Sequence, residues 1–352
     1  MVPCPPTIER ISIRSVTFRS DHALLTDHEV DWEDGGVRFP KPEWSLTARH
    51  PVTHSMGEHI TIEIELLVEP PDAAPEVGSL IGTGPRGLSF KKNGIRFAGG
   101  RFSIEMMSTL PIPRQVSELS FAVTWQVSGV SVPVTPQTTR NKVYVTIGPP
   151  TTPSNRPGIT LRRMREAIRA AGKANRMDPH SIAGQVLSRW GAFNLDVALD
   201  NAWELADDRR NARGELVGAD CQTIVRYTQK VLRMIGCPGL LEFVVVWAKV
   251  PTPAQGEQNP AYSPNVSDPP QWHNDHRPYD SARATWLAAL VDHGGRHNSY
   301  EACLRVSHDG VTAYYAGGVG RLPDADAVIR VFASMSWRDD ATLETKESIY
   351  VY

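Results

Sequence analysis

Cysteine is scarce in this sequence and follows no pattern that would organise a fold. The 352 residues include four cysteines, at positions 4, 221, 237 and 303, with no CxxC spacing. This distribution argues against a disulfide framework and against a zinc ribbon. Because a few free cysteines with histidines elsewhere in the chain suit a reduced compartment, a catalytic thiol stays open as an interpretation.

Long apolar runs and an excess of one charge are also missing. No stretch approaches the ~20 apolar residues that a transmembrane helix needs, and the N-terminus lacks the basic and then apolar pattern of a secretory signal. The net charge is −2, so bulk charge does not indicate a nucleic-acid or membrane partner. We therefore predict a cytoplasmic protein without such partners, and leave open an export route that needs no cleaved signal.

The first part of the chain has the pattern of a β-sandwich. Residues 59–66 alternate, with isoleucines on one face, and residues 11–18, 119–127 and 142–147 are further strand candidates. Turn-forming clusters separate these runs. We predict that residues 1–148 form an all-β, immunoglobulin-like sandwich that positions a substrate or binds a protein partner.

A proline-rich linker at 149–158 precedes a change of pattern, and residues 159–352 are predicted to form an α+β domain. The expected helices cover 161–171, a segment starting at Asp178-Pro179, 195–205, 220–234 and 324–332. The expected strands cover 241–247, 300–307, 311–315 and 348–352. Residues 251–280 hold seven prolines and are predicted to form a lid or specificity loop.

Cys221 is the candidate nucleophile. Asp220 is a suitable N-cap, which places Cys221 in the first helical turn, near the positive end of the helix dipole. That position favours the thiolate, the nucleophilic form of cysteine. The alternative is that Cys221 is a small buried core residue.

His297 is the candidate general base. A thiol nucleophile needs a proton acceptor within hydrogen-bond reach. His297 lies just before the expected strand 300–306, which can pack beside the helix of Cys221 once the chain folds back. The competing choices are His293, four residues earlier, and a solvated loop histidine with no catalytic role.

These residues resemble the transglutaminase-like core of the papain-like cysteine hydrolases, over roughly residues 160–320. The resemblance lies in the Gly-Ala-Asp-Cys helix start at 218–221, in the Leu-Arg-x-x-Gly-Cys-Pro exit at 232–238, and in the four-residue spacing of His297 and Glu301. It implies a nucleophile at Cys221 and a base at His297. The Cys221 backbone N–H, at the helix start, is a candidate oxyanion donor. Gln185 is a second candidate donor, and the alternative is that it occupies a surface position of its helix.

The third catalytic member is left open. In the transglutaminase-like family the third member is an acidic residue on the strand after the histidine. The corresponding residues here, 314–318, are Tyr-Tyr-Ala-Gly-Gly and contain no carboxylate. The candidates are Asn298, Asp309, Asp324 and Asp326. Ser299 stands where the family has an aromatic residue. An inactive domain that serves as a binding or scaffold protein is therefore the second hypothesis.

A further resemblance, to NlpC/P60 cell-wall peptidases, competes for the same cysteine. Asp220-Cys221 followed by Val225 and Tyr227 is similar to their Asp-Cys helix start, although Gln222-Thr223 departs from their Ser-Gly. It implies a peptidoglycan amidase with the same nucleophile.

The sequence thus predicts a thiol-dependent amide hydrolase or acyltransferase acting on a polypeptide, as a peptidase, deamidase or transglutaminase-like enzyme. Hydrolysis is favoured because it needs no second substrate site, and the layout would suit a bacterial peptidase or a delivered effector. No cofactor or metal is predicted. His273, Asn274, Asp275 and His276 are ligand-type residues, but they lie in the proline-rich loop, where nothing fixes their geometry.

Overall fold

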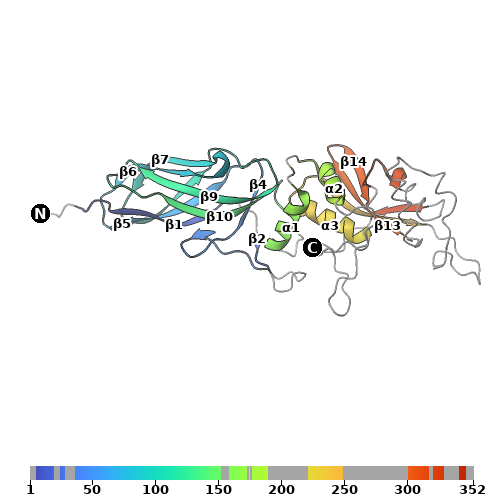
Figure 1. The fold of residues 1–352 in the computed structure, drawn as a ribbon, viewed down its shortest axis with the longest axis horizontal. Coiled ribbons are helices and arrows are strands. Elements are labelled where there is room, and N and C mark those ends of the chain that lie inside the picture. Colours follow the sequence, from blue (N-terminus) through green and yellow to red (C-terminus); the bar gives the residue numbers. More distant parts are fainter. Residues whose placement is uncertain are drawn as a thin grey trace, which may run out of the picture. The chain divides into compact units, whose positions relative to one another are not determined.

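The structure is a computed structural model, and it is rich in β-strands. It describes residues 5–19, 24–27, 36–151, 158–172, 174, 177–188, 221–248, 300–316, 320–328 and 341–345 (Figure 1). The chain divides into two compact units. Unit 1 is Met1–Arg176 with Met234–Gly236, and unit 2 is Met177–Arg233 with Cys237–Tyr352. This division groups α1, Leu161–Ala171, with unit 1, whereas the sequence-based division places that segment after the linker 149–158.

Unit 1 contains two larger sheets. The first has the order β3 (Trp44–Ser45), β1 (Arg10–Phe18), β5 (Thr61–Glu69) and β8 (Gly100–Met107). The second has the order β4 (Val52–Ser55), β10 (Gln137–Thr146), β9 (Ser117–Ser128), β6 (Glu76–Thr83) and β7 (Ser89–Phe97). Neighbouring strands are antiparallel, except that β4 runs parallel to β10. A 3-10 turn, η1 (Pro85–Gly87), follows β6, and a short parallel pair joins β2 (Leu24–Leu25) to β11 (Ile159–Thr160).

Alternation along the strands explains how the two sheets pack. In β5 the apolar residues at positions 62, 64, 66 and 68 are all buried, because a strand directs every second side chain to the same face. Each such buried side chain contributes about 1.5–3 kcal/mol. Aromatic contacts then join the sheets, with the ring centroids of Phe18 and Phe121 6.1 Å apart. The strands predicted around 11–18, 59–66, 119–127 and 142–147 are confirmed as β1, β5, β9 and β10.

Unit 2 combines helices with one antiparallel sheet. The helices are α2 (Pro179–Ser188) and α3 (Cys221–Met234). The sheet order is β15 (Gly320–Leu322), β14 (Val311–Ala316), β13 (Tyr300–His308), β12 (Leu240–Ala248) and β16 (Ala341–Thr345). The strands predicted at 241–247, 300–307 and 311–315 are confirmed as β12, β13 and β14. Asp309 and Gly310 join β13 to β14 with φ of 48° and 76°, as a two-residue hairpin turn of this kind requires.

The expected helices and the remaining expected segments have mixed outcomes. The helices predicted at 161–171, after Asp178, and at 220–234 are confirmed as α1, α2 and α3. A helical turn at 325–328 falls within the helix expected at 324–332. The helix at 195–205, the loop 251–280 and the strand 348–352 lie outside the described residues. Among the described residues, no helix is both long enough and apolar enough to cross a membrane.

Candidate active site at the start of helix α3

Cys221 is the first residue of α3, as the sequence predicts. The helix that follows is buried on nearly all sides. Along 225–232 only Arg226 is partly exposed, and even Gln229 and Lys230 are 2% and 5% exposed. A surface helix has an exposed polar face, so burial of this extent identifies α3 as the central helix of unit 2.

Contacts with β12 fix the direction of α3 on the sheet. Gln229 Nε2 donates a hydrogen bond to the Leu241 carbonyl at 2.9 Å, and Arg233 donates to the same oxygen at 3.1 Å. One turn toward the helix start, the Arg226 guanidinium lies 5.0 Å from the centre of the Phe243 ring. Earlier helix residues therefore contact later strand residues, so α3 and β12 run antiparallel and α3 begins toward the end of β12.

The exit of α3 is closed by a glycine. Gly236 adopts a φ of 64°, and the Cys237 N–H donates to the Leu232 carbonyl at 2.9 Å. This six-residue bond around a left-handed glycine is the Schellman arrangement that ends many helices. Cys237 is 7% exposed, and burial raises the pKa of its thiol to about 12, with the Asp178 carboxylate adding to the rise. Cys237 is therefore an unreactive thiol at neutral pH.

The start of β13 lies at the same end of the sheet as the end of β12. Trp247 pairs with Tyr300, whereas Leu240 pairs with Ser307 at the other end. His297 precedes Tyr300 by three positions in the sequence, and three steps along a chain span at most about 11 Å. His293, His297 and Asn298 lie outside the described residues, as does the side chain of Cys221.

The three carboxylates named as candidate third members, Asp309, Asp324 and Asp326, all lie among the described residues. Asp309 lies in the β13–β14 turn, at the opposite end of the sheet from the start of α3, and its carboxylate is 3.3 Å from His308 Nε2. Asp324 accepts a hydrogen bond from the Ala327 N–H at 2.6 Å and so caps the turn at 325–328. Asp326 is exposed in that turn.

Helix α2 packs on the same sheet and carries the predicted oxyanion donor Gln185. Its apolar residues Ile182, Ala183, Val186 and Leu187 are buried, while Gln185 is exposed. The helix begins as predicted, because Asp178 Oδ1 accepts a hydrogen bond from the His180 N–H at 3.0 Å. Gln185 therefore lies on the exposed face of α2, not on the face that packs on the sheet.

A histidine–tyrosine pair in this unit has no counterpart in the sequence reasoning. His180 Nδ1 lies 3.0 Å from the Tyr315 hydroxyl, 135 residues away in sequence. Burial lowers the pKa of His180, the Arg321 cation lowers it further, and the Asp178 carboxylate opposes both. Burial also raises the pKa of Tyr315 to about 12. Both partners are therefore held neutral, and they join α2 to β14 without a charge.

Neither a metal site nor a known relative adds to this geometry. Within the described ranges, no three His, Cys, Asp or Glu side chains converge as metal ligands. The ligand-type residues at 273–276 lie outside those ranges. No protein-family model matches the chain, and no curated protein matches it.

Proposed function

We propose that unit 2 is a thiol-dependent amide hydrolase or acyltransferase in which Cys221 is the nucleophile and His297 the general base. One observation carries the proposal: the central buried helix begins at Cys221, toward the end of the sheet where β13 begins three residues after His297. The start of a helix favours a thiolate. The Gly-x-Asp-Cys start, the Leu-Arg-x-x-Gly-Cys-Pro exit and a helix lying on an antiparallel sheet support a transglutaminase-like domain of the papain-like class.

The chemistry follows from these roles. His297 accepts the proton of the Cys221 thiol, and the thiolate attacks the amide carbonyl, forming the carbon–sulfur bond. The carbon–nitrogen bond then breaks, and His297 returns the proton to the departing amine. Water resolves the thioester in hydrolysis, and a second amine resolves it in transfer. The first N–H groups of a helix have no acceptor within it, so the Cys221 N–H is available to the oxyanion.

Unit 1 then serves as a binding module for a polypeptide. Its two face-to-face sheets, with β1 and β4 assigned to opposite sheets, support an immunoglobulin-like sandwich. Such a module would hold a substrate or a protein partner. A peptidoglycan amidase would use the same nucleophile on a different substrate. Assays with a muropeptide and with a protein substrate would therefore distinguish a peptidoglycan amidase from an enzyme that acts on polypeptides.

A binding or scaffold domain without catalysis is the second candidate. It is favoured by the placement of Asp309 in the β13–β14 turn, at the opposite end of the sheet from the start of α3. In that case Cys221 would be a structural residue with ordinary thiol reactivity.

Labelling with iodoacetamide at pH 6 separates the two candidates. Native protein and its His297→Ala and His293→Ala variants would be treated briefly, and each cysteine peptide quantified by mass spectrometry. We expect Cys221 to be labelled at least ~100-fold faster than Cys237, with the rate falling in His297→Ala and unchanged in His293→Ala. Equal labelling of Cys221 in native and denatured protein, or no response to His297→Ala, would reject the enzyme.

A further inference from the structure

The outer edge of β1 in unit 1 is only partly paired. On one side, β1 pairs with β5 from Arg10 to Phe18. On the other side, its pairing among the described residues is limited to Ser15 and Val16, opposite β3. No described strand therefore pairs with this side of the stretch 10–13, and such open edges are the part of a sheet to which another extended chain can add.

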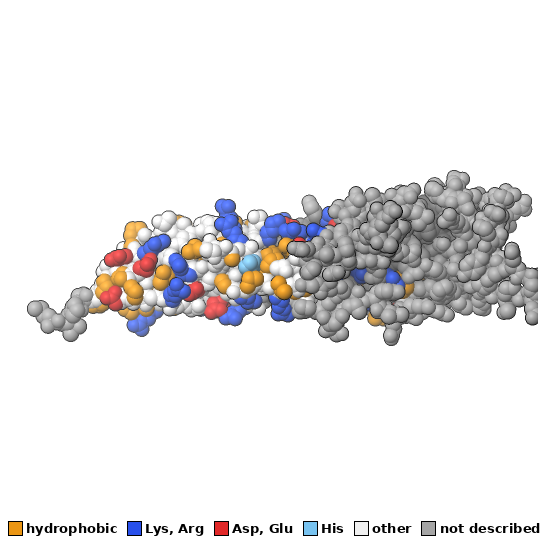
Figure 2. Space-filling view, turned by 90° about the horizontal axis from the view of Figure 1, so that it is seen from below, with side chains coloured by type: hydrophobic (Ala, Val, Ile, Leu, Met, Phe, Trp, Pro, Cys, Tyr) orange, Lys and Arg blue, Asp and Glu red, His pale blue; other side chains and the backbone are white. Residues whose placement is uncertain are grey.

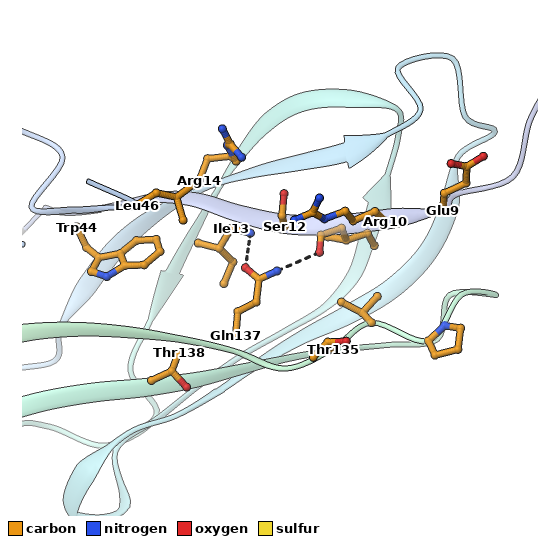
Figure 3. A pocket seen from close by; sticks show the side chains of 13 residues that line it. Glu9, Arg10, Ser12, Ile13, Arg14, Trp44, Leu46, Thr135, Gln137 and Thr138 are labelled. Carbon is orange, nitrogen blue, oxygen red and sulfur yellow. Dashed lines mark hydrogen bonds between the residues drawn. The ribbon is translucent and has the colours of Figure 1, made fainter. Parts of the chain in front are cut away.

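A side-chain amide occupies this edge in place of a strand. Gln137, the first residue of β10, accepts a hydrogen bond from the Ile13 N–H at 2.8 Å and donates one to the Ile11 carbonyl at 3.3 Å (Figure 3). One residue of a neighbouring parallel strand would make the same two bonds on either side of Ser12. Gln137 thus substitutes for one peptide unit, and no described strand pairs with the rest of this stretch on the same side.

A cleft of about 640 Å³ runs along this edge, within the size range of ligand sites. Trp44 and Leu46 line one end, and Leu46 is 64% exposed. Ser12 also lines the cleft. Its Oγ is buried and has no hydrogen-bond partner within the described part of the chain.

The charge beside the edge indicates the side chains of that ligand. Positions 10, 12 and 14 alternate with the core residues Ile11 and Ile13, so Arg10, Ser12 and Arg14 belong to the other face of β1. Figure 3 shows Arg14 extending to the side of β1 away from Gln137. Arg10 lies 3.8 Å from Glu69, whereas Arg14 makes no ion pair with any described residue. A strand placed here would meet an uncompensated positive charge on this face.

We propose that the edge of β1 at residues 11–13 binds an extended polypeptide as an added strand. The bound segment displaces the Gln137 amide, hydrogen-bonds to Ile11 and Ile13 through its backbone, and presents an acidic side chain to Arg14. Its alternate side chains face the cleft near Trp44 and Leu46. The site lies within unit 1 and does not depend on the thiol chemistry proposed for unit 2.

The test uses the full chain with Cys221→Ala, so that any hydrolysis is removed and the result is independent of the proposed enzyme. The probes are fluorescein-labelled hexapeptides measured by anisotropy: alternating Glu-Val, alternating Lys-Val, and alternating Glu-Val with every second backbone amide N-methylated. We expect the Glu-Val peptide to bind, and the other two to bind at least tenfold more weakly. Equal binding of the N-methylated peptide would overturn strand addition.

Two substitutions locate the binding. Gln137→Ala removes the competing amide, so we expect the Glu-Val peptide to bind about fivefold more tightly. Arg14→Glu should weaken it at least tenfold, while Arg96→Glu, the same charge change at an exposed position of β7, should not. Arg14 is on the surface side of β1, so this variant tests the site even if Gln137→Ala is unstable. Unchanged affinity in Arg14→Glu, or no binding to any variant, would reject the site.

Discussion

Helix α3 has a cysteine at its first residue and another just beyond its last turn, so the two occupy opposite ends of the helix. Cys221 is the first residue of the helix, and Cys237 follows the glycine that ends it. The exit is buried, and burial raises the pKa of the Cys237 thiol to about 12. The start of a helix instead stabilises negative charge. The same residue type is therefore expected to be inert at one end and nucleophilic at the other, and its place on the helix makes the difference.

The largest expected effect is the loss of acyl transfer when Cys221 is changed. With p-nitrophenyl acetate, Cys221 Sγ would form a thioester as the carbon–oxygen bond breaks, releasing a burst of p-nitrophenolate. We expect Cys221→Ser to slow this burst at least ~100-fold. Cys237→Ala is the matched control and should leave the burst rate unchanged. A burst that survives Cys221→Ser, or disappears in Cys237→Ala, would contradict the expected difference between the two cysteines.

The helix exit should matter for stability instead. Gly236 has a φ of 64°, in the left-handed region, where a residue with a Cβ is strained. A Cβ at Gly236 would also lie 2.2 Å from the Gly148 carbonyl oxygen, a backbone atom. We therefore expect Gly236→Ala to lower the free energy of unfolding by more than the roughly 1–2 kcal/mol that the left-handed conformation costs by itself. Gly310→Ala is the control, because Gly310 has a φ of 76° and no described atom lies within 4 Å of its Cβ position, so this change should cost less. Urea denaturation measures both, and equal stability of all three proteins would contradict the assigned exit.

A smaller effect should come from the contact that fixes α3 on the sheet. Gln229 is buried and donates to the Leu241 carbonyl, which also accepts a hydrogen bond from Arg233. Because the carbonyl keeps its second donor, we expect Gln229→Met to cost only about 0.5–1.5 kcal/mol. Urea denaturation would show this loss, and the alkylation rate of Cys221 should change little. A large fall in that rate would mean that Gln229 acts at the site itself.

Local signals in the sequence were enough to predict several elements. Asp178-Pro179 begins α2, and Gly236 ends α3, because caps act within a few residues of the chain. The alternation of β5 could be predicted for a similar reason: one of its faces is buried throughout. Each of these signals is short-range and appears directly in the residue pattern.

Other features depend on residues far apart, and the pattern does not contain them. β7 was not predicted, since it is exposed from Lys91 to Gly94 and pairs with β6 across a register shift that interrupts the period of two. β16 is fixed by its pairing with β12, about 100 residues away. The pairing of His180 with Tyr315 also spans most of unit 2. Tertiary contact sets all three.

The smallest effect concerns pH and belongs to α2. Burial, and then the Arg321 cation, lower the pKa of His180, so the folded state prefers the neutral ring. Its contribution to stability is therefore present above the unfolded pKa of about 6.5 and is lost as the pH falls through the lower folded value. We expect the melting temperature to fall slightly less between pH 7.5 and 5 in His180→Gln than in the native protein. An equal or steeper fall in the variant would contradict the assigned direction.

The most direct test of the nucleophile is the pH dependence of alkylation at the two ends of α3. The rate constants of Cys221 and Cys237 with iodoacetamide would be followed in one native sample from pH 4.5 to 9, each by its own peptide. The account predicts that Cys221 reaches its plateau with a midpoint below about 7, while Cys237 stays slow throughout. A Cys221 midpoint at or above about 8.5, the value of an ordinary thiol, would contradict the claim that Cys221 is an activated nucleophile.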